Sequence, residues 1–226
     1  MLKFTDINKE AIGQLAPFFA GQCTHLSDYS LGYQFMWYKY LAPAFAVAED
    51  CLIIREHYAG GDWFRYPLSR TGDMEAERRA VALIERCCRD HEVRLRFSGV
   101  KADAVPWLTL RYSDVSVTNT RRWRDYLYEA ESFRTFAGGK YAGQRNHVNK
   151  FKKMYPDWSF EGYMPAREAE LVAFLKEYEA AQRAKADELA DEEMNEVYGL
   201  VPMIVPFGLR CGLLRAGGKI VACAIG

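Results

Sequence analysis

One stretch of the chain combines a helical pattern with an unbroken absence of acidic residues. No Asp or Glu occurs between Glu131 and Asp157, although the 226-residue chain carries 30 acidic and 30 basic side chains. From Lys140 to Tyr155 the apolar and polar side chains separate onto opposite sides at helical spacing. We therefore expect an amphipathic helix here, whose apolar side packs onto a core. That apolar side consists of Tyr141, Val148, Phe151 and Tyr155.

The polar side of this helix, with its two shoulders, is the candidate binding surface. Its members are Lys140, Arg145, Asn146, Asn149, Lys150 and Lys153. Asparagine is a weak helix former because its amide competes for nearby backbone groups, so two asparagines in mid-helix indicate a functional position. Two interpretations stay open: an ordinary solvated basic face, or a surface that lines a cleft between two structural units and binds an anionic ligand.

Patterns elsewhere predict a first domain with the element order β-α-α-β-β-β-α-β-α-β-β. Three features carry most of this prediction: a hairpin of strands 44–48 and 51–56 around Glu49-Asp50, a third strand over 62–66, and a helix over 73–90. The inner face expected for that helix is Ala80, Leu83, Ile84, Cys87 and Cys88. The remaining expected elements are a strand over 94–98, a helix over 102–110 and two strands over 112–119 and 123–129.

After the basic helix in the sequence, the first half of this order of helices and strands repeats. We expect a strand over 158–163, helices over 167–185 and 187–198, and a hairpin of strands 209–214 and 219–225. The last strand is almost wholly apolar from Ile220 to Ile225, which is typical of a strand inside a sheet. We therefore expect these 226 residues alone to self-associate through this strand or to be poorly soluble.

Several classes of protein fit the sequence poorly. The four histidines (His25, His57, His91 and His147) are scattered, which gives no metal-binding spacing. The six cysteines form no CxxC pair, and most lie in apolar segments, so we expect reduced thiols in a cytoplasmic protein. The first residues do not form a signal peptide, and the most apolar stretch, 200–214, is interrupted by Pro202, Pro206 and Arg210. We expect no transmembrane segment.

Three motifs carry a resemblance to a known family. Gly139-Lys140-Tyr141, the run from Arg145 to Asn149, and Phe151 resemble the linker-helix motif of a bacterial family of unknown function. That family is related to the C-terminal domain of phosphatidylglycerol lysyltransferases. Weaker matches follow at 29–37, 125–128 and 221–226.

The resemblance implies an α/β fold with mixed sheets, built from tandem GNAT-like (acyl-CoA N-acyltransferase-like) domains. The first domain would span 1–130, the basic junction helix would lie within 131–157, and 158–226 would form only the first half of a second copy.

The resemblance also implies an acyl- or aminoacyl-transferase. The donor would be an activated ester, either acyl-coenzyme A or aminoacyl-tRNA, and the acceptor an amine or a hydroxyl. The anionic partner of the basic helix would be the phosphates of the donor, a tRNA or a lipid headgroup. No catalytic residue, metal ligand or firm cofactor is assigned.

One turn supports an alternative function for the chain, that of a non-catalytic binding or regulatory protein on a degenerate GNAT scaffold. The family binds its acyl donor at a glycine-rich turn before a helix. The corresponding turn here, 68–74, has one glycine and leads into a helix that begins with Asp73, Glu75 and Glu77. These carboxylates use the positive helix end and repel phosphate, so we predict that coenzyme A does not bind there.

Overall fold

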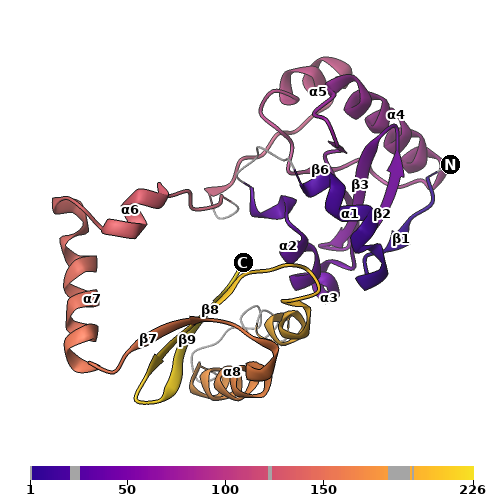
Figure 1. Ribbon diagram of the computed structural model, residues 1–226. Helices are drawn as coiled ribbons and strands as arrows, with labels where there is room; N and C mark the ends of the chain where they lie inside the picture. Colours follow the sequence, from indigo (N-terminus) through magenta and orange to yellow (C-terminus); the bar gives the residue numbers. More distant parts are fainter. Residues whose placement is uncertain (1, 21–25, 122–123, 183–193, 195) are drawn as a thin grey trace. The chain divides into compact units, whose positions relative to one another are not determined.

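The computed structural model describes residues 2–20, 26–121, 124–182, 194 and 196–226 (Figure 1). The chain divides into two compact units, Met1–Trp123 (unit 1) and Arg124–Gly226 (unit 2). Each unit has its own sheet and its own buried core. The architecture is therefore mixed α/β.

Unit 1 is built around a mixed sheet. Its elements in chain order are β1 (Thr5–Asp6), η1 (Lys9–Ala11), α1 (Ile12–Phe19), η2 (Ser27–Tyr29), α2 (Leu31–Met36), α3 (Tyr38–Leu41), β2 (Ala44–Ala48), β3 (Cys51–Tyr58), β4 (Gly61–Arg65), β5 (Leu68–Ser69), α4 (Met74–Asp90), β6 (Phe97–Ser98) and α5 (Val105–Arg111). The strand order is β1-β2-β3-β4-β6, and β5 pairs with β3. Only β4 and β6 are parallel; the other neighbours are antiparallel.

The predicted hairpin at the centre of this sheet is confirmed. Ala48 pairs with Cys51, so only Glu49 and Asp50 form the turn. Both turn residues have positive φ angles, 52° and 54°. A two-residue turn with this backbone matches the right-handed twist of the strands that it connects.

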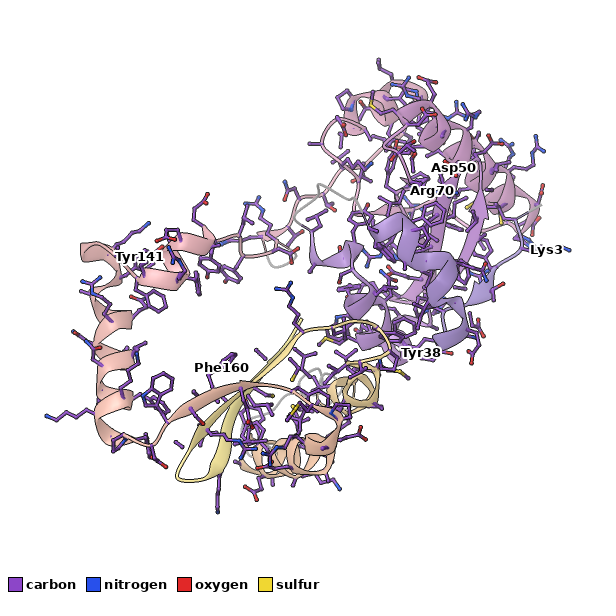
Figure 2. The ribbon with its side chains drawn as sticks, in the orientation of Figure 1. Lys3, Tyr38, Asp50, Arg70, Tyr141 and Phe160 are labelled. Atoms are coloured by element: carbon purple, nitrogen blue, oxygen red, sulfur yellow. The ribbon has the colours of Figure 1, made fainter. Side chains whose placement is uncertain are left out.

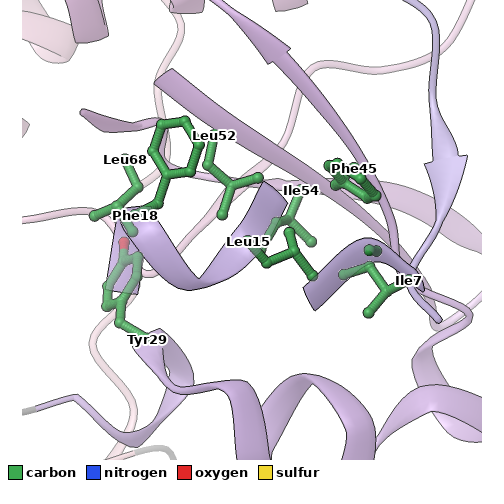
Figure 3. Packing of buried hydrophobic residues seen from close by; sticks show 9 residues of the cluster. Ile7, Leu15, Phe18, Tyr29, Phe45, Leu52, Ile54 and Leu68 are labelled. Carbon is green, nitrogen blue, oxygen red and sulfur yellow. The ribbon is translucent and has the colours of Figure 1, made fainter. Parts of the chain in front are cut away.

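Successive residues of β3 pack against opposite faces of the sheet. Leu52 and Ile54 contact the cluster formed by α1, in which Leu15 and Phe18 are buried (Figure 3). Cys51 and Ile53 belong to the cluster of α4 on the other face. Because side chains alternate along a strand, an unbroken apolar run such as this one requires cover on both faces.

Helix α4 has the predicted extent but a slightly different inner face. Ala80, Ile84, Cys87 and Cys88 are buried as expected. Leu83 is only half-buried, and Val81 takes its place in the core. The reason is α5, whose Leu108 packs beside Val81 and Tyr66 and so widens the buried side of α4.

Unit 2 begins with helices and ends with a small antiparallel sheet. Its elements are α6 (Ala130–Thr135), η4 (Gly139–Tyr141), α7 (Ala142–Met154), β7 (Ser159–Gly162), η5 (Pro165–Arg167), α8 (Glu168–Gln182), η6 (Val201–Met203), β8 (Cys211–Ala216) and β9 (Lys219–Ile225). The strand order is β7-β8-β9. Leu171 and Leu175 of α8 are buried against Leu213 of β8 and Ile220 of β9. The helix expected over 187–198 lies largely outside the described residues, although 196–200 are helical.

Two strands predicted for the end of the first domain are wrong. Residues 112–119 and 124–129 form no strand in the described part of the chain. In the first of these segments Val115 and Val117 are 40% and 59% exposed. No described strand pairs with either segment, and an extended segment without a partner cannot satisfy its backbone within a sheet.

Across the ranges that the structure describes, we find no helix that combines the length and the apolar surface needed to cross a bilayer.

Candidate functional site

Helix α7 carries the predicted binding residues on an exposed stripe. Asn146, Asn149, Lys150 and Lys153 follow one another at intervals of three, one and three residues, which places them along one side of the helix. All four are exposed. Nothing in their spacing or exposure gives them a packing role.

The two lysines of this stripe have no acidic partner in the described structure. Lys150 and Lys153 form no ion pair with any carboxylate of the described residues. Their helix contains no acidic residue, and its last turn holds Lys152 and Lys153. No carboxylate on the helix therefore offsets the repulsion between neighbouring lysines. An anion bound beside the stripe would reduce this repulsion and so lower the electrostatic free energy of the helix.

The expectation that the apolar side of α7 packs onto a core is wrong. No residue of the helix is buried. Val148 and Tyr155 are 38% and 40% exposed. The rings instead contact one another and nearby rings: Phe151 lies 5.1 Å from Tyr155, and Tyr141 lies 5.8 Å from Phe136 of the preceding turn (ring centroids; Tyr141 is labelled in Figure 2).

Arg145 differs from the other predicted site residues because its guanidinium is occupied. Its Nη1 donates to the backbone carbonyl of Phe136 and, at 2.7 Å, to that of Gly138. Phe136 and Gly138 have positive φ angles of 48° and 89°. Arg145 thus ties the turn after α6 to α7, and the structure gives it a positioning role.

Lys140 lies at the start of the basic stretch. Its Nζ lies 4.7 Å from the centre of the Tyr141 ring, a cation–π contact that leaves the ammonium exposed. The hydrogen bond with Ser132 and the adjacent Lys140 lower the pKa of the Tyr141 hydroxyl. An anion can therefore contact the exposed ammonium groups of Lys140, Lys150 and Lys153. Arg145 instead holds the turn after α6 against α7.

The turn before α4 is filled by groups of the protein itself. Asp73 Oδ1 accepts hydrogen bonds from the backbone N–H of Glu75 and Ala76, at 2.9 and 3.2 Å. Buried Glu77 accepts from the backbone of Ser69 at 3.3 Å and from Lys101 Nζ at 2.5 Å. The donors that would hold a phosphate at this helix start are therefore already used.

A buried polar cluster in unit 1 was missed by sequence reasoning. Arg65 Nε donates to Glu56 Oε1 at 2.7 Å, and its Nη1 lies 2.8 Å from Asp28 Oδ2. The guanidinium also lies 4.9 Å from the ring centre of Tyr33. Burial raises the pKa of the Glu56 carboxyl, which Arg65 opposes, and burial raises the pKa of Tyr33 to about 12.

This cluster lies where the parallel strands end. Arg65 is the last residue of β4 and pairs with Ser98, the last residue of β6. Gly99 follows at a φ of 60°, and its carbonyl accepts from the Tyr29 hydroxyl at 2.9 Å. The only sequence signal was the placement of charged residues within apolar strands, at Glu56 and Arg65. The Nε–Glu56 hydrogen bond pairs the two buried charges, while Nη1 meets Asp28 at ion-pair distance without hydrogen-bond geometry. The pairing of opposite charges in the core indicates a structural role.

Comparison with known proteins finds a family whose model matches most of the chain and a solved structure with a similar fold. The family model described as the C-terminal region of phosphatidylglycerol lysyltransferase matches residues 22–226. A crystal structure of a conserved protein of unknown function from Bacteroides thetaiotaomicron VPI-5482 is similar, with a TM-score of 0.88 and 24% sequence identity. The likeness covers 100% of this chain and 75% of that one, and at this identity it establishes the fold. No curated protein matches the chain.

Proposed function

The chain belongs to the family of phosphatidylglycerol lysyltransferase C-terminal domains, and from this membership we propose that it is an acyl- or aminoacyl-transferase of tandem-GNAT type. The donor is an activated acyl or aminoacyl ester, and the acceptor is an amine or a hydroxyl. The observation that carries the proposal is the family match, which runs through both units and includes α7.

The arrangement of strands supports the tandem part of the proposal. In unit 1 β1 pairs with β2 and β2 with β3, all antiparallel, with α1, α2 and α3 between the first two strands. In unit 2 β7 pairs with β8 and β8 with β9 in the same manner, with α8 between the first two. The same order of strands and connections in both sheets fits two copies of one domain.

The basic stripe of α7 supports the choice of donor. Both acyl-coenzyme A and aminoacyl-tRNA carry several phosphates, and exposed lysines without acidic partners attract phosphate over a distance set by the ionic strength. In the proposed reaction the acceptor nitrogen or oxygen attacks the carbonyl carbon of the donor ester. A new amide or ester bond forms, the carrier's oxygen or sulfur leaves, and the proton lost by the acceptor passes to it.

Such a reaction depends mainly on positioning. Holding an activated ester beside an acceptor removes much of the entropic barrier, and hydrogen-bond donors aimed at the developing oxyanion remove more. In this mechanism Lys140, Lys150 and Lys153 bind the donor's phosphates. Arg145 keeps the turn after α6 against the start of α7.

The occupied turn before α4 favours a second candidate, a binding or regulatory protein without transferase activity. In unit 1 the backbone N–H groups around the start of α4 already donate to the carboxylates of Asp73 and Glu77. This unit therefore does not offer the acyl-donor turn of active GNAT domains. The two candidates differ in one measurable property, the formation of a covalent product.

A transfer assay separates them. The purified chain is incubated with tRNA charged with a radiolabelled amino acid, or with radiolabelled acyl-coenzyme A, and with either a soluble amine or phosphatidylglycerol vesicles as acceptor. We expect label in the acceptor with one donor, and little with the Lys150→Ala/Lys153→Ala variant. Label that stays on the donor in every combination, while charged tRNA still binds, would establish the binding protein instead.

A further inference from the structure

A continuous row of aromatic rings leads up to the basic helix. The row consists of Tyr126, Tyr128, Phe133, Phe136 and Tyr141. Successive ring centroids are 6.2, 4.6, 5.7 and 5.8 Å apart. Tyr126, Tyr128 and Phe133 are 86%, 55% and 49% exposed, so much of this row faces solvent.

Tyr126 and Tyr128 have the geometry of a stacking platform. Their rings are almost parallel, with 12° between the planes. Their centroids are 6.2 Å apart, as expected for two side chains on the same side of an extended segment. Flat rings held in this way accept another flat ring on a face, and every nucleobase offers one.

The row ends at cationic groups. Lys140 lies over Tyr141, the last ring, and α7 with Lys150 and Lys153 begins at the next residue. Glu131, two residues before Phe133 in α6, is paired with Arg134 at 2.6 Å. Arg145 links the turn of Phe136 to α7 and so joins the aromatic row to the basic stripe.

We propose that the aromatic row stacks the unpaired bases of a nucleotide ligand, while Lys140 and the stripe of α7 hold its phosphates. Aromatic platforms beside a track of positive charge are the arrangement by which proteins hold single-stranded nucleic acid. The inference rests on the proposed function, because both candidate donors carry an adenine nucleotide. The base comes either from coenzyme A or from the single-stranded 3′ end of a charged tRNA.

The composition of the row favours a base over a lipid surface or a second copy of the chain. Leu127 is the one large aliphatic side chain exposed between Tyr126 and Tyr141 in this fully described segment. The tyrosine rings present flat π faces with polar hydroxyls at their edges, and the lysines at the end of the row supply the positive charge that a nucleotide's phosphates require.

The test measures binding with the full chain and separates the two sources. Coenzyme A and a short single-stranded oligonucleotide ending in CCA, each with a fluorescent reporter, are titrated at one fixed salt concentration. We expect Tyr126→Leu/Tyr128→Leu to weaken binding of at least one of them by about tenfold or more. The Tyr126→Phe/Tyr128→Phe variant, which keeps the rings, should bind like the unchanged chain.

Tyr178→Leu is the matched control. Tyr178 lies on α8 of the same unit, is 48% exposed and is not in the row. Thermal unfolding of each variant confirms that the fold is retained. Binding that depends on Lys150 and Lys153 but not on Tyr126 and Tyr128 would overturn the stacking inference while leaving the proposed function in place.

Three further outcomes also count against the inference. Loss of binding to phosphatidylglycerol vesicles, with nucleotide binding unchanged in the leucine variant, would make the row a membrane contact. A change in sedimentation alone would make it a contact between copies. Binding of neither nucleotide by the unchanged chain would remove the inference together with the proposed donors.

Discussion

Arg65 and Glu56 form a buried ion pair that joins neighbouring strands of unit 1. The Nε–Oε1 distance is 2.7 Å, and the two side chains are 5% and 6% exposed. Removing one partner of such a pair leaves a charge in a medium of low dielectric, where it cannot recover the hydration that it lost on folding.

The first prediction follows from this pair. Glu56→Gln should lower the free energy of unfolding of unit 1 by about 3 kcal/mol, the low end for a broken buried pair, because Asp28 still contacts Arg65. Denaturant-dependent exchange of the β3 amides measures the change. Asp50→Asn is the control: the Asp50–Arg70 pair is about half exposed and should contribute less than about 1 kcal/mol. Equal effects of the two substitutions would contradict the prediction.

The second prediction concerns the start of α4. Asp73→Ala should destabilise unit 1 by about 1 kcal/mol, because two backbone N–H groups lose their acceptor. Asp73→Ser, which supplies another capping oxygen, should restore most of the loss. Calorimetric titration of both variants should show no coenzyme A binding at this turn, since Glu77 still occupies it. Saturable binding that appears on removal of Asp73 would show that the capping carboxylate alone excluded the ligand.

The third prediction concerns the stripe of α7. Lys150→Ala and Lys153→Ala should each weaken tRNA binding and reduce the slope of log affinity against log salt by about 1, the value expected for one lost phosphate contact. Filter binding over a series of salt concentrations gives the slope. Lys176→Ala, an exposed lysine on α8, should leave it unchanged. An unaltered slope in all three variants would return α7 to an ordinary solvated helix.

The fourth prediction is a pH dependence in unit 2. Arg215 contacts Glu170 at 2.6 Å and Glu161 at 2.5 Å, and the hydrogen bonds from Arg215 lower the pKa of the Glu170 carboxyl below its ordinary value of 4.5. A lowered pKa in the folded state means that the stabilisation is present above pH 4.5 and is lost as the pH falls through the folded-state pKa.

The protection factors of the β8 amides, taken relative to the unfolded chain at each pH, should therefore fall on acidification below pH 4.5, the ordinary value for this carboxyl. In Arg215→Met this loss of protection should be smaller, because Arg215 is the largest cause of the lowered Glu170 pKa and only the weaker effect of Arg167 remains. An acid response of equal size in both proteins would assign it to other carboxylates.

The fifth prediction concerns the edge strand β9. It pairs only with β8 among the described residues, and Val221 is 42% exposed. Beyond Lys219 the strand has neither charge nor proline, and such edges invite pairing with another chain. We expect self-association of the 226-residue chain, seen by sedimentation at roughly tens of micromolar. Val221→Lys should reduce it, and Val205→Lys, at an exposed position outside the strands, should not. A stable monomer before any substitution would refute the prediction.

The sequence alone predicted the elements that depend on local interactions. Helix α4 was predicted over 73–90 from its apolar spacing, and the β2–β3 hairpin from its two-residue turn. The positive charge of α7 and its lack of acidic residues were also evident from the sequence. Each of these features is decided within a few residues along the chain, by backbone preferences and side-chain periodicity.

Tertiary structure decided the features that need a distant partner. Val115 and Val117 alternate like strand residues, yet the segment is not a strand because no described strand pairs with it. Arg145 looked like its neighbours on the helix, but the carbonyl groups of the turn after α6 occupy it. Arg65 and Glu56 meet only because β3 and β4 pair, and Asp28 joins them from a segment far earlier in the chain. The periodicity of the sequence determines on which face of its own helix or strand a side chain lies. Which residue it contacts on that face depends on how the whole unit packs.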